Sequence, residues 1–291
     1  MLAVGGWEQY SELDIQFNRD QGAAWVWMQP SLRPCFNQQI LQELRDFQDK
    51  LRLLNERSIG ELPIPYFVGA SRIPGVFGLG GDLELFAELI EARDAIALRN
   101  YAKCCIDIIY LNAVNFHLPM LTIALVQGDA LGGGFEAALS CNVIIAERKA
   151  RFGLPEILFN LFPGMGAYPL LSRRVGPGRA ERLILDGNIH TAEELHAMGI
   201  VDLLVDDGEG EHCVDDYIRR HRRRRLGHQG MFRVRQHCNP LAYDDLLGVI
   251  DIWVESALCL TKRDLRMMRR LARAQNRVGT DEEDGNLIAA F

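Results

Sequence analysis

The sequence predicts an α/β fold with parallel strands, followed by a helical C-terminal region. Short apolar segments alternate with helical ones up to residue 205, which is typical of parallel strands connected by helices. Two glycine-rich turns, at residues 78–81 and 128–134, each follow an apolar segment and precede a helical one. After the polar, glycine-containing segment 206–211, the pattern is helical throughout.

The composition is that of a globular protein. The chain has 291 residues, of which 48% are hydrophobic and 24% charged, and these values are ordinary for a folded, soluble protein. The length suffices for one large domain or two smaller ones. The net charge of −7 gives no reason to expect nucleic acid or an anionic membrane surface as a partner.

The cysteines and the N-terminus indicate a cytoplasmic protein. The seven cysteines include no Cys-x-x-Cys pair, and an odd number without regular spacing fits reduced thiols better than disulfides. The N-terminus lacks the basic segment and apolar segment of a secretory signal. No apolar run approaches the roughly 18 residues of a membrane span, so we expect none.

The first predicted elements are a hairpin, a helix and a strand. Residues 13–17 alternate between apolar and polar, residues 23–28 are apolar and aromatic, and turn residues separate them, which predicts a β-hairpin. Apolar residues at steps of three and four between residues 36 and 54 predict an amphipathic helix. Residues 66–70 are a short apolar strand.

The central region continues the alternation. The glycine turn at 78–81 leads into a helix, with Asp82 as the expected N-cap. A long helix is predicted over residues 95–116, a buried strand over 121–126 and a helix over 136–140.

Two more strands, at 143–146 and 201–205, flank two helices at 179–185 and 192–198. The segment 206–211 is the one plausible boundary in the chain. We therefore predict a core domain over residues 1–210 and a C-terminal helical region over residues 211–291.

The glycine turns do not match nucleotide-binding or common hydrolase motifs. Leu83 occupies the place of the third glycine in the dinucleotide fingerprint, and the turn at 128–134 lacks the Lys-Ser/Thr of a phosphate-binding loop. The chain contains neither a Gly-x-Ser-x-Gly nucleophile elbow nor a His-Glu-x-x-His zinc motif. His212-Cys213 and His237-Cys238 have no further ligands at suitable spacing, so no metal site is predicted.

Two helix-opening turns and two glutamates carry the chemistry. Helix N-termini offer unpaired N–H groups and the positive end of the macrodipole, so two converging turns would make an oxyanion hole from backbone alone. Glu136 and Glu156 each lie in otherwise apolar segments. Apolar surroundings raise a carboxyl pKa, which suits acid–base work near neutral pH. This combination indicates an enzyme that acts on a thioester.

Three ordered motifs resemble the crotonase (enoyl-CoA hydratase/isomerase) superfamily. They are Phe77-Gly78-Leu79-Gly80-Gly81-Asp82-Leu83, the segment 128–136, and Gly153-Leu154-Pro155-Glu156. The 20 residues that separate Glu136 from Glu156 equal the separation of the two catalytic glutamates in the hydratases. The resemblance implies a crotonase-like ββα spiral core.

A closer resemblance is to the bacterial diffusible-signal-factor synthases, which make cis-2-unsaturated fatty-acid quorum signals. Residues 131–141, 154–168 and 252–254 carry it. It implies dehydration of a 3-hydroxyacyl thioester on acyl carrier protein, followed by hydrolysis to the free acid. The substrate would be carried on the phosphopantetheine of the carrier protein, or on CoA, and no other cofactor is expected.

The resemblance also implies residue roles. The amides of Gly81 and Gly133 would receive the negative charge of the carbonyl oxygen, while Glu136 and Glu156 would divide acid and base work, in an order that the sequence does not decide. Met165, Trp253 and Leu271 would line the acyl pocket. Apolar residues at helical spacing usually pack in a core, so for Trp253 and Leu271 both interpretations stay open.

Partners and alternatives remain. The basic run at residues 219–225 is either a solvated face or a docking site for an acidic carrier protein. The superfamily favours trimers and hexamers, with the C-terminal helices as contacts. Two other functions are open: a CoA-dependent enoyl-CoA hydratase of fatty-acid oxidation, and a non-catalytic regulator that binds the receiver domain of a sensor kinase. Retention of both glutamates argues against a purely non-catalytic role.

Overall fold

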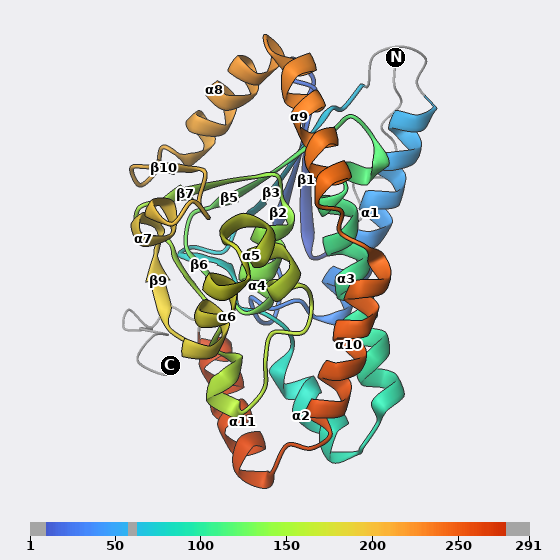
Figure 1. Cartoon of the computed structure of the whole chain (residues 1–291), viewed down its shortest axis with the longest axis vertical. Helices are drawn as coiled ribbons and strands as arrows, with labels where there is room; N and C mark the ends of the chain where they lie inside the picture. Colours follow the sequence, from blue (N-terminus) through green and yellow to red (C-terminus); the bar gives the residue numbers. More distant parts are fainter. Residues whose placement is uncertain (1–9, 58–62, 278–291) are drawn as a thin grey trace.

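The computed structural model describes residues 10–57 and 63–277, and a six-stranded sheet runs through it (Figure 1). The strand order is β1-β2-β3-β5-β7-β10. β1 and β2 form the predicted antiparallel hairpin, and all other neighbours pair in parallel. The predicted α/β fold is confirmed. The strands are β1 (Leu13–Asn18), β2 (Ala23–Met28), β3 (Tyr66–Ser71), β5 (Leu121–Val126), β7 (Val143–Glu147) and β10 (Leu203–Val205).

A second sheet contains four short strands in the order β4-β6-β8-β9, of which only β9 is antiparallel to its neighbour. Each of β3, β5 and β7 is followed by a strand of this sheet and then by helix. This repeat is the ββα spiral that the resemblance implied. The sequence did not predict these strands, because three residues are too few to show a period of two. They are β4 (Val76–Gly78), β6 (Asp129–Leu131), β8 (Arg151–Gly153) and β9 (Ile189–Thr191).

Helices cover both faces of the large sheet, so alternate residues of a strand enter different cores. On β5, Ala124 and Val126 belong to the main core, which contains α1 (Gln38–Glu56) and α3 (Ala95–Ala113). Ile123 and Leu125 point to the other face and pack under α8 (Gly210–Arg222). Burial on both faces explains why this strand is apolar without alternation.

The long helix predicted to run to residue 116 ends earlier, at Ala113, and a 3₁₀ turn η1 (Asn115–His117) follows. Phe116 in this turn has a φ of 58°. Its ring is fully buried and contacts Phe67 of β3, with the ring centroids 5.6 Å apart. Burial of the ring stabilises a backbone conformation that is uncommon for a residue with a side chain.

The remaining helices of the α/β region differ in what they contact: α4 and α7 pack against strands of the second sheet, whereas α2 packs against α3 and the C-terminal helix α11 (Lys262–Arg277), and α5 against α4 and α6. Asp82 caps α2 as predicted, with its carboxylate accepting from the N–H of Leu85. Helix α5 was not predicted. The helices are α2 (Leu83–Glu91), α4 (Gly133–Ser140), the 3₁₀ helix η2 (Pro155–Phe159), α5 (Ala167–Val175), α6 (Pro177–Asp186) and α7 (Ala192–Ala197).

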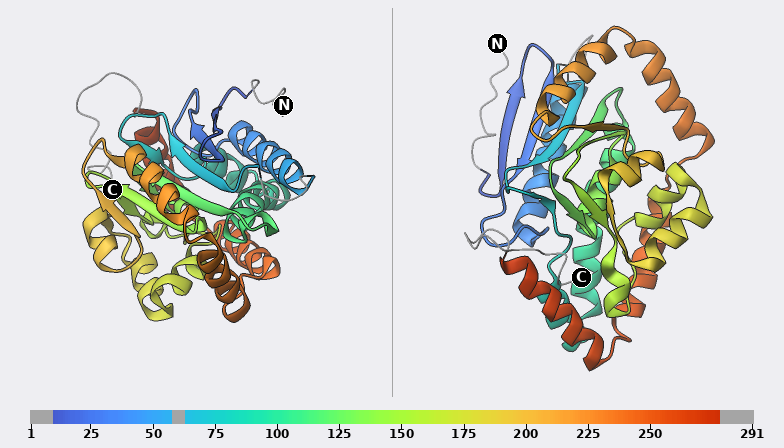
Figure 2. Two further views of the ribbon diagram at one scale, coloured as in Figure 1. Left: turned by 90° about the horizontal axis from the view of Figure 1, so that it is seen from above. Right: turned by 90° about the vertical axis from the view of Figure 1, so that its left-hand side faces the viewer.

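The C-terminal region is helical over its described residues, as predicted, and residues 278–291 lie outside the described ranges. Besides α8 it contains α9 (Arg225–Cys238), α10 (Tyr243–Ala257) and α11 (Lys262–Arg277). α10 packs against α3, and α11 packs against α2. α8 and α9 lie at one end of the molecule and α11 at the other (Figures 1 and 2). Among the described residues, no helix combines the length and apolar character needed to cross a membrane.

Candidate active site

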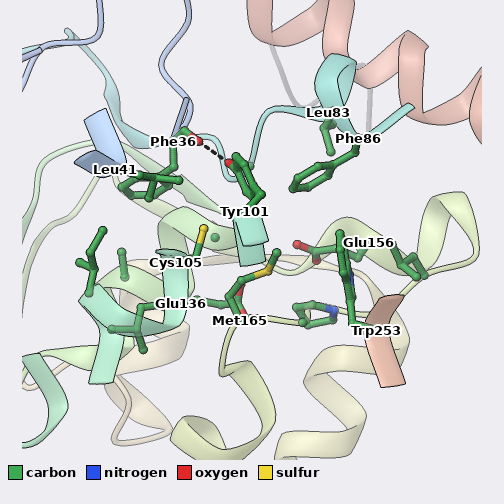
Figure 3. Close-up of a pocket in the computed structure, with 18 of the residues that line it drawn as sticks. Phe36, Leu41, Leu83, Phe86, Tyr101, Cys105, Glu136, Glu156, Met165 and Trp253 are labelled. Carbon is green, nitrogen blue, oxygen red and sulfur yellow. Dashed lines mark hydrogen bonds between the residues drawn. The ribbon is translucent and has the colours of Figure 1, made fainter. Parts of the chain in front are cut away.

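A cavity between α2, α3, α4, η2 and α10 brings most of the predicted site residues together (Figure 3). The space inside it, which includes some open solvent, is about 640 Å³. Leu271 is buried in the core on α11 and is not among the lining residues. The predicted site residues that do line the cavity are Gly81, Gly133, Glu136, Glu156, Met165 and Trp253.

The two glycine turns meet at this cavity. A β-carbon built on Gly133 would lie 3.4 Å from the Cα of Gly80 and 3.5 Å from the amide nitrogen of Gly81. The Gly81 and Gly133 amides are therefore neighbours, although 52 residues separate them in the chain. A β-carbon on Gly80, whose φ is +89°, would lie 3.2 Å from the amide nitrogen of Gly133, so glycine at position 80 permits this approach.

Hydrogen bonds fix where the two amides point. The carbonyl of Gly80 accepts the N–H of Phe36 at 2.8 Å, and the N–H of a trans peptide points opposite to its C=O. The N–H of Gly81 is therefore directed away from Phe36. Gly133 is the first residue of α4, where an N–H has no partner inside the helix. Both residues line the cavity, as the predicted oxyanion hole requires.

Glu136 lies on α4 and is 1% exposed. Burial raises its pKa to about 7, although hydrogen bonds from the amides of Ala167 and Met165 oppose the rise. Both N–H groups donate to the same oxygen, Oε1, at 2.9 Å. These bonds hold the carboxylate in one orientation and favour its charged form.

Glu156 follows Pro155 in η2. Within the described part of the chain, its carboxyl accepts no pair of backbone amides of the kind that Glu136 does. Its Oε2 atom is buried and has no hydrogen-bond partner among the described residues. Burial and the negative charge of Glu136 raise the pKa of Glu156 to about 8. Burial and the neighbouring charge favour the neutral form of Glu156, whereas the two amide hydrogen bonds favour the charged form of Glu136.

Apolar side chains form the rest of the wall. The rings of Phe86 and Trp253 meet edge to face, with centroids 5.2 Å apart, and Trp253 lies against Gly164 so closely that a β-carbon there would overlap its ring. Tyr101, which also lines the cavity, accepts the N–H of Asp82 and donates to the carbonyl of Phe36. The sequence did not reveal Phe86 or Tyr101, because both belong to apolar helical stripes that look like ordinary core.

The basic run at residues 219–225 lies around the end of α8, away from α2 and α11 (Figure 1). Arg219 pairs with Asp216, and Arg222 donates to the carbonyl of Asp20. His221 is buried and bonds to the hydroxyl of Tyr66. The run is therefore not a uniform cationic face.

The cavity thus combines two carboxyls of raised pKa with the two glycine turns. The chain matches the sequence model described as enoyl-CoA hydratase/isomerase over residues 66–274. The match covers most of the chain, and the protein belongs to this family.

Individual curated relatives are also named as probable enoyl-CoA hydratases. The Mycobacterium leprae protein named probable enoyl-CoA hydratase echA8 is 39% identical over 161 residues, which are 53% of this chain and 58% of the relative. The first two curated relatives are matched over only about half to three-fifths of their own length.

Solved structures share the fold. Pseudomonas aeruginosa DspI has a TM-score of 0.69 at 25% identity, covering 84% of this chain and 94% of that chain. An enoyl-CoA hydratase/isomerase of Xanthobacter autotrophicus Py2 has a TM-score of 0.73 at 22% identity, covering 97% of this chain and 96% of that chain.

The raised carboxyl pKa values predict a pH-dependent stability. Between the ordinary glutamate pKa of 4.5 and about 8, the folded protein binds more protons than the unfolded chain, so its stability falls as pH rises. Glu156→Gln should remove part of this dependence. The variant should gain stability relative to the native protein from pH 5 to pH 8, by a few kcal/mol at about 1.4 kcal/mol per pKa unit.

Urea unfolding at a series of pH values measures the difference. Glu181→Gln, at an exposed position on α6, is the matched control and should show no trend. A constant difference between Glu156→Gln and the native protein would contradict the assigned environment of Glu156.

Gly132 is predicted to be indispensable to the placement of Glu156. Its φ is +53°, and a β-carbon there would lie 2.6 Å from Oε1 of Glu156. Gly132→Ala should therefore displace the carboxyl and lower hydration of a 2-enoyl-CoA thioester by roughly 100-fold or more, the range for loss of a general acid–base group. Gly178→Ala, where a β-carbon meets nothing within 4 Å, should keep full activity. A near-native rate in Gly132→Ala would contradict the prediction that the reaction needs the Glu156 carboxyl in this position.

Proposed function

We propose that the protein dehydrates a 3-hydroxyacyl thioester on acyl carrier protein and then hydrolyses the thioester, releasing a cis-2-unsaturated fatty acid that serves as a quorum signal. The observation that carries this proposal is the pairing of Glu136 and Glu156 beside the Gly81 and Gly133 amides in an apolar cavity. The resemblance of residues 131–141 and 154–168 to the signal synthases supports the choice of reaction. The shared fold with DspI is in keeping with it.

Dehydration needs a base and an acid on one substrate. One carboxylate removes the proton alpha to the thioester, the other carboxyl protonates the 3-hydroxyl, and water leaves as the double bond forms. Burial raises the pKa of both carboxyls, so each can accept or donate a proton near neutral pH.

Hydrolysis uses the same parts. A carboxylate takes a proton from water as the oxygen attacks the thioester carbonyl, and the Gly81 and Gly133 amides receive the negative charge of the tetrahedral intermediate. The phosphopantetheine thiol then departs with a proton. Loss of one such donor typically costs about 100- to 1000-fold in rate.

A CoA-dependent enoyl-CoA hydratase is the second candidate. Curated relatives include 2,3-dehydroadipyl-CoA hydratase of Escherichia coli, 38% identical over 125 residues. Hydration of an enoyl thioester reverses the dehydration step and needs the same pair of carboxyls. This alternative differs in the carrier and in the absence of free acid among the products.

One assay separates the two candidates. The purified protein is incubated with 3-hydroxydodecanoyl acyl carrier protein, and free cis-2-dodecenoic acid is measured by mass spectrometry. Glu136→Gln and Glu156→Gln should each lower its release by about 100- to 10,000-fold, and the exposed control Glu181→Gln should not. Hydration of 2-dodecenoyl-CoA with no free acid would support the hydratase instead.

We also propose that copies of the chain associate through the C-terminal helices. On α9, three large apolar side chains are more than half exposed: Leu226, Met231 and Val234. Burying them against another copy would remove apolar surface from water. Met231→Asp with Val234→Asp should reduce the molar mass measured by light scattering to that of one chain, while Arg233→Asp, at an exposed position between them, should not. An unchanged mass in the double variant would refute this contact.

A further inference from the structure

The last described turn of α11 contacts the glycine turn that carries the Gly81 amide. Gln275 on this helix is 2% exposed. Its Nε2 atom donates to the carbonyl of Leu79 at 2.6 Å and to that of Gly81 at 3.4 Å. Gln275 is not among the residues that line the cavity, so any influence on the reaction passes through the turn.

The two carbonyls bracket the peptide that supplies the oxyanion donor. Leu79 precedes this peptide and Gly81 follows it, while its own carbonyl, on Gly80, bonds to Phe36. Gly80 has a φ of +89°. Consecutive glycines are the most freely rotating backbone in a protein, so a turn built from them needs external bonds to keep one orientation.

The orientation of the Gln275 amide is determined by its partners. Both neighbours of Nε2 are carbonyl oxygens, which can only accept, so the NH₂ group and not the oxygen faces the turn. The Oε1 atom is buried without a partner among the described residues. Both hydrogen bonds of this side chain are therefore made by its NH₂ group, and both go to the glycine turn.

The next peptide along the turn is held at both ends. Gln275 bonds to the carbonyl of Gly81, and the hydroxyl of Tyr101 accepts the N–H of Asp82. Outside the turn, Arg269 of α11 forms a two-pronged ion pair with Glu91 of α2, the helix that begins directly after Asp82. Helix α11 therefore bonds to the glycine turn through Gln275 and to helix α2 through Arg269.

We propose that Gln275 is a positioning residue that keeps the Gly81 N–H aimed at the thioester oxygen. The C-terminal helix is then part of the oxyanion hole, although it never touches the substrate. This inference rests on the proposed reaction of an acyl thioester.

The test uses Gln275→Met, which keeps the length and apolar volume of the side chain but removes both donors. Arg273→Met places the same residue at an exposed position of the same turn of α11 and is the matched control. With 3-hydroxydodecanoyl acyl carrier protein, Gln275→Met should lower kcat roughly 10-fold, part of the loss expected for removing a donor outright. KM should change less than twofold, and Arg273→Met should behave as the native protein.

A spectroscopic measurement separates positioning from damage to the fold. S-(2-oxotridecyl)pantetheine, a ketone analogue that cannot be hydrolysed, is labelled with ¹³C at the carbonyl, and its stretching frequency is measured by difference infrared spectroscopy. Two donors on the oxygen should lower this frequency in the native protein, and the shift should shrink in Gln275→Met at a temperature where unfolding curves show both proteins folded.

A second variant covers the case in which Gln275→Met does not fold. Gln275→Glu preserves the shape of the side chain, and its protonated carboxyl donates one bond where the amide donates two, so kcat and the frequency shift should lie between those of the native protein and of Gln275→Met. A full native shift in both Gln275 variants would overturn the positioning role. Absence of any shift in the native protein would instead refute the proposed function.

Discussion

The whole site depends on the close approach of two backbone turns, at Gly80–Gly81 and Gly132–Gly133. The approach allows the amides of Gly81 and Gly133 to serve one oxygen, and it sets α2 and α4 on either side of the cavity. It also places Glu136, one turn into α4, opposite Glu156, whose Oε1 lies where a side chain on Gly132 would be. Helix N-termini are favourable places for negative charge, so the geometry that would admit the proposed thioester would also suit the oxyanion formed from it.

Keeping the carboxyls of Glu136 and Glu156 away from bulk water lowers the stability of the fold. Two neighbouring carboxyls away from bulk water cannot both be ionised at low cost, and the Oε2 atom of Glu156 has no hydrogen-bond partner among the described residues. The amides of Met165 and Ala167 favour the charge on Glu136, and this charge in turn favours the neutral form of Glu156. An arrangement in which both groups were equally supported would hold two charges and provide no acid.

The sequence predicted the longer elements and the motif residues of the site, but not the short strands or Phe86 and Tyr101 in the cavity wall. The hairpin, the long strands and the caps have local causes, such as period-two alternation at residues 13–17 and an acceptor side chain at Asp82. The glycine turns and glutamates were visible because polar and glycine residues stand out in apolar segments. The three-residue strands are too short to show a hydrophobic period. Phe86 and Tyr101 pack in the core on one side and line the cavity on the other, so their sequence pattern is that of core residues. Gln275 gives no signal, since its partners are backbone carbonyls almost 200 residues away.

The C-terminal helices supply further parts of the site, of which Trp253 was predicted and Gln275 was not. Trp253 on α10 closes the cavity against Gly164 and Phe86, and Gln275 on α11 bonds to the turn of Gly81. Both lie beyond the polar segment 206–211, where the sequence changes character. The three motifs of the glycine turns and glutamates end by residue 168, yet Trp253 and Gln275 follow them by more than 80 positions. If the proposed reaction holds, a change in the packing of α10 and α11 should alter it without altering the two glutamates or the two glycines.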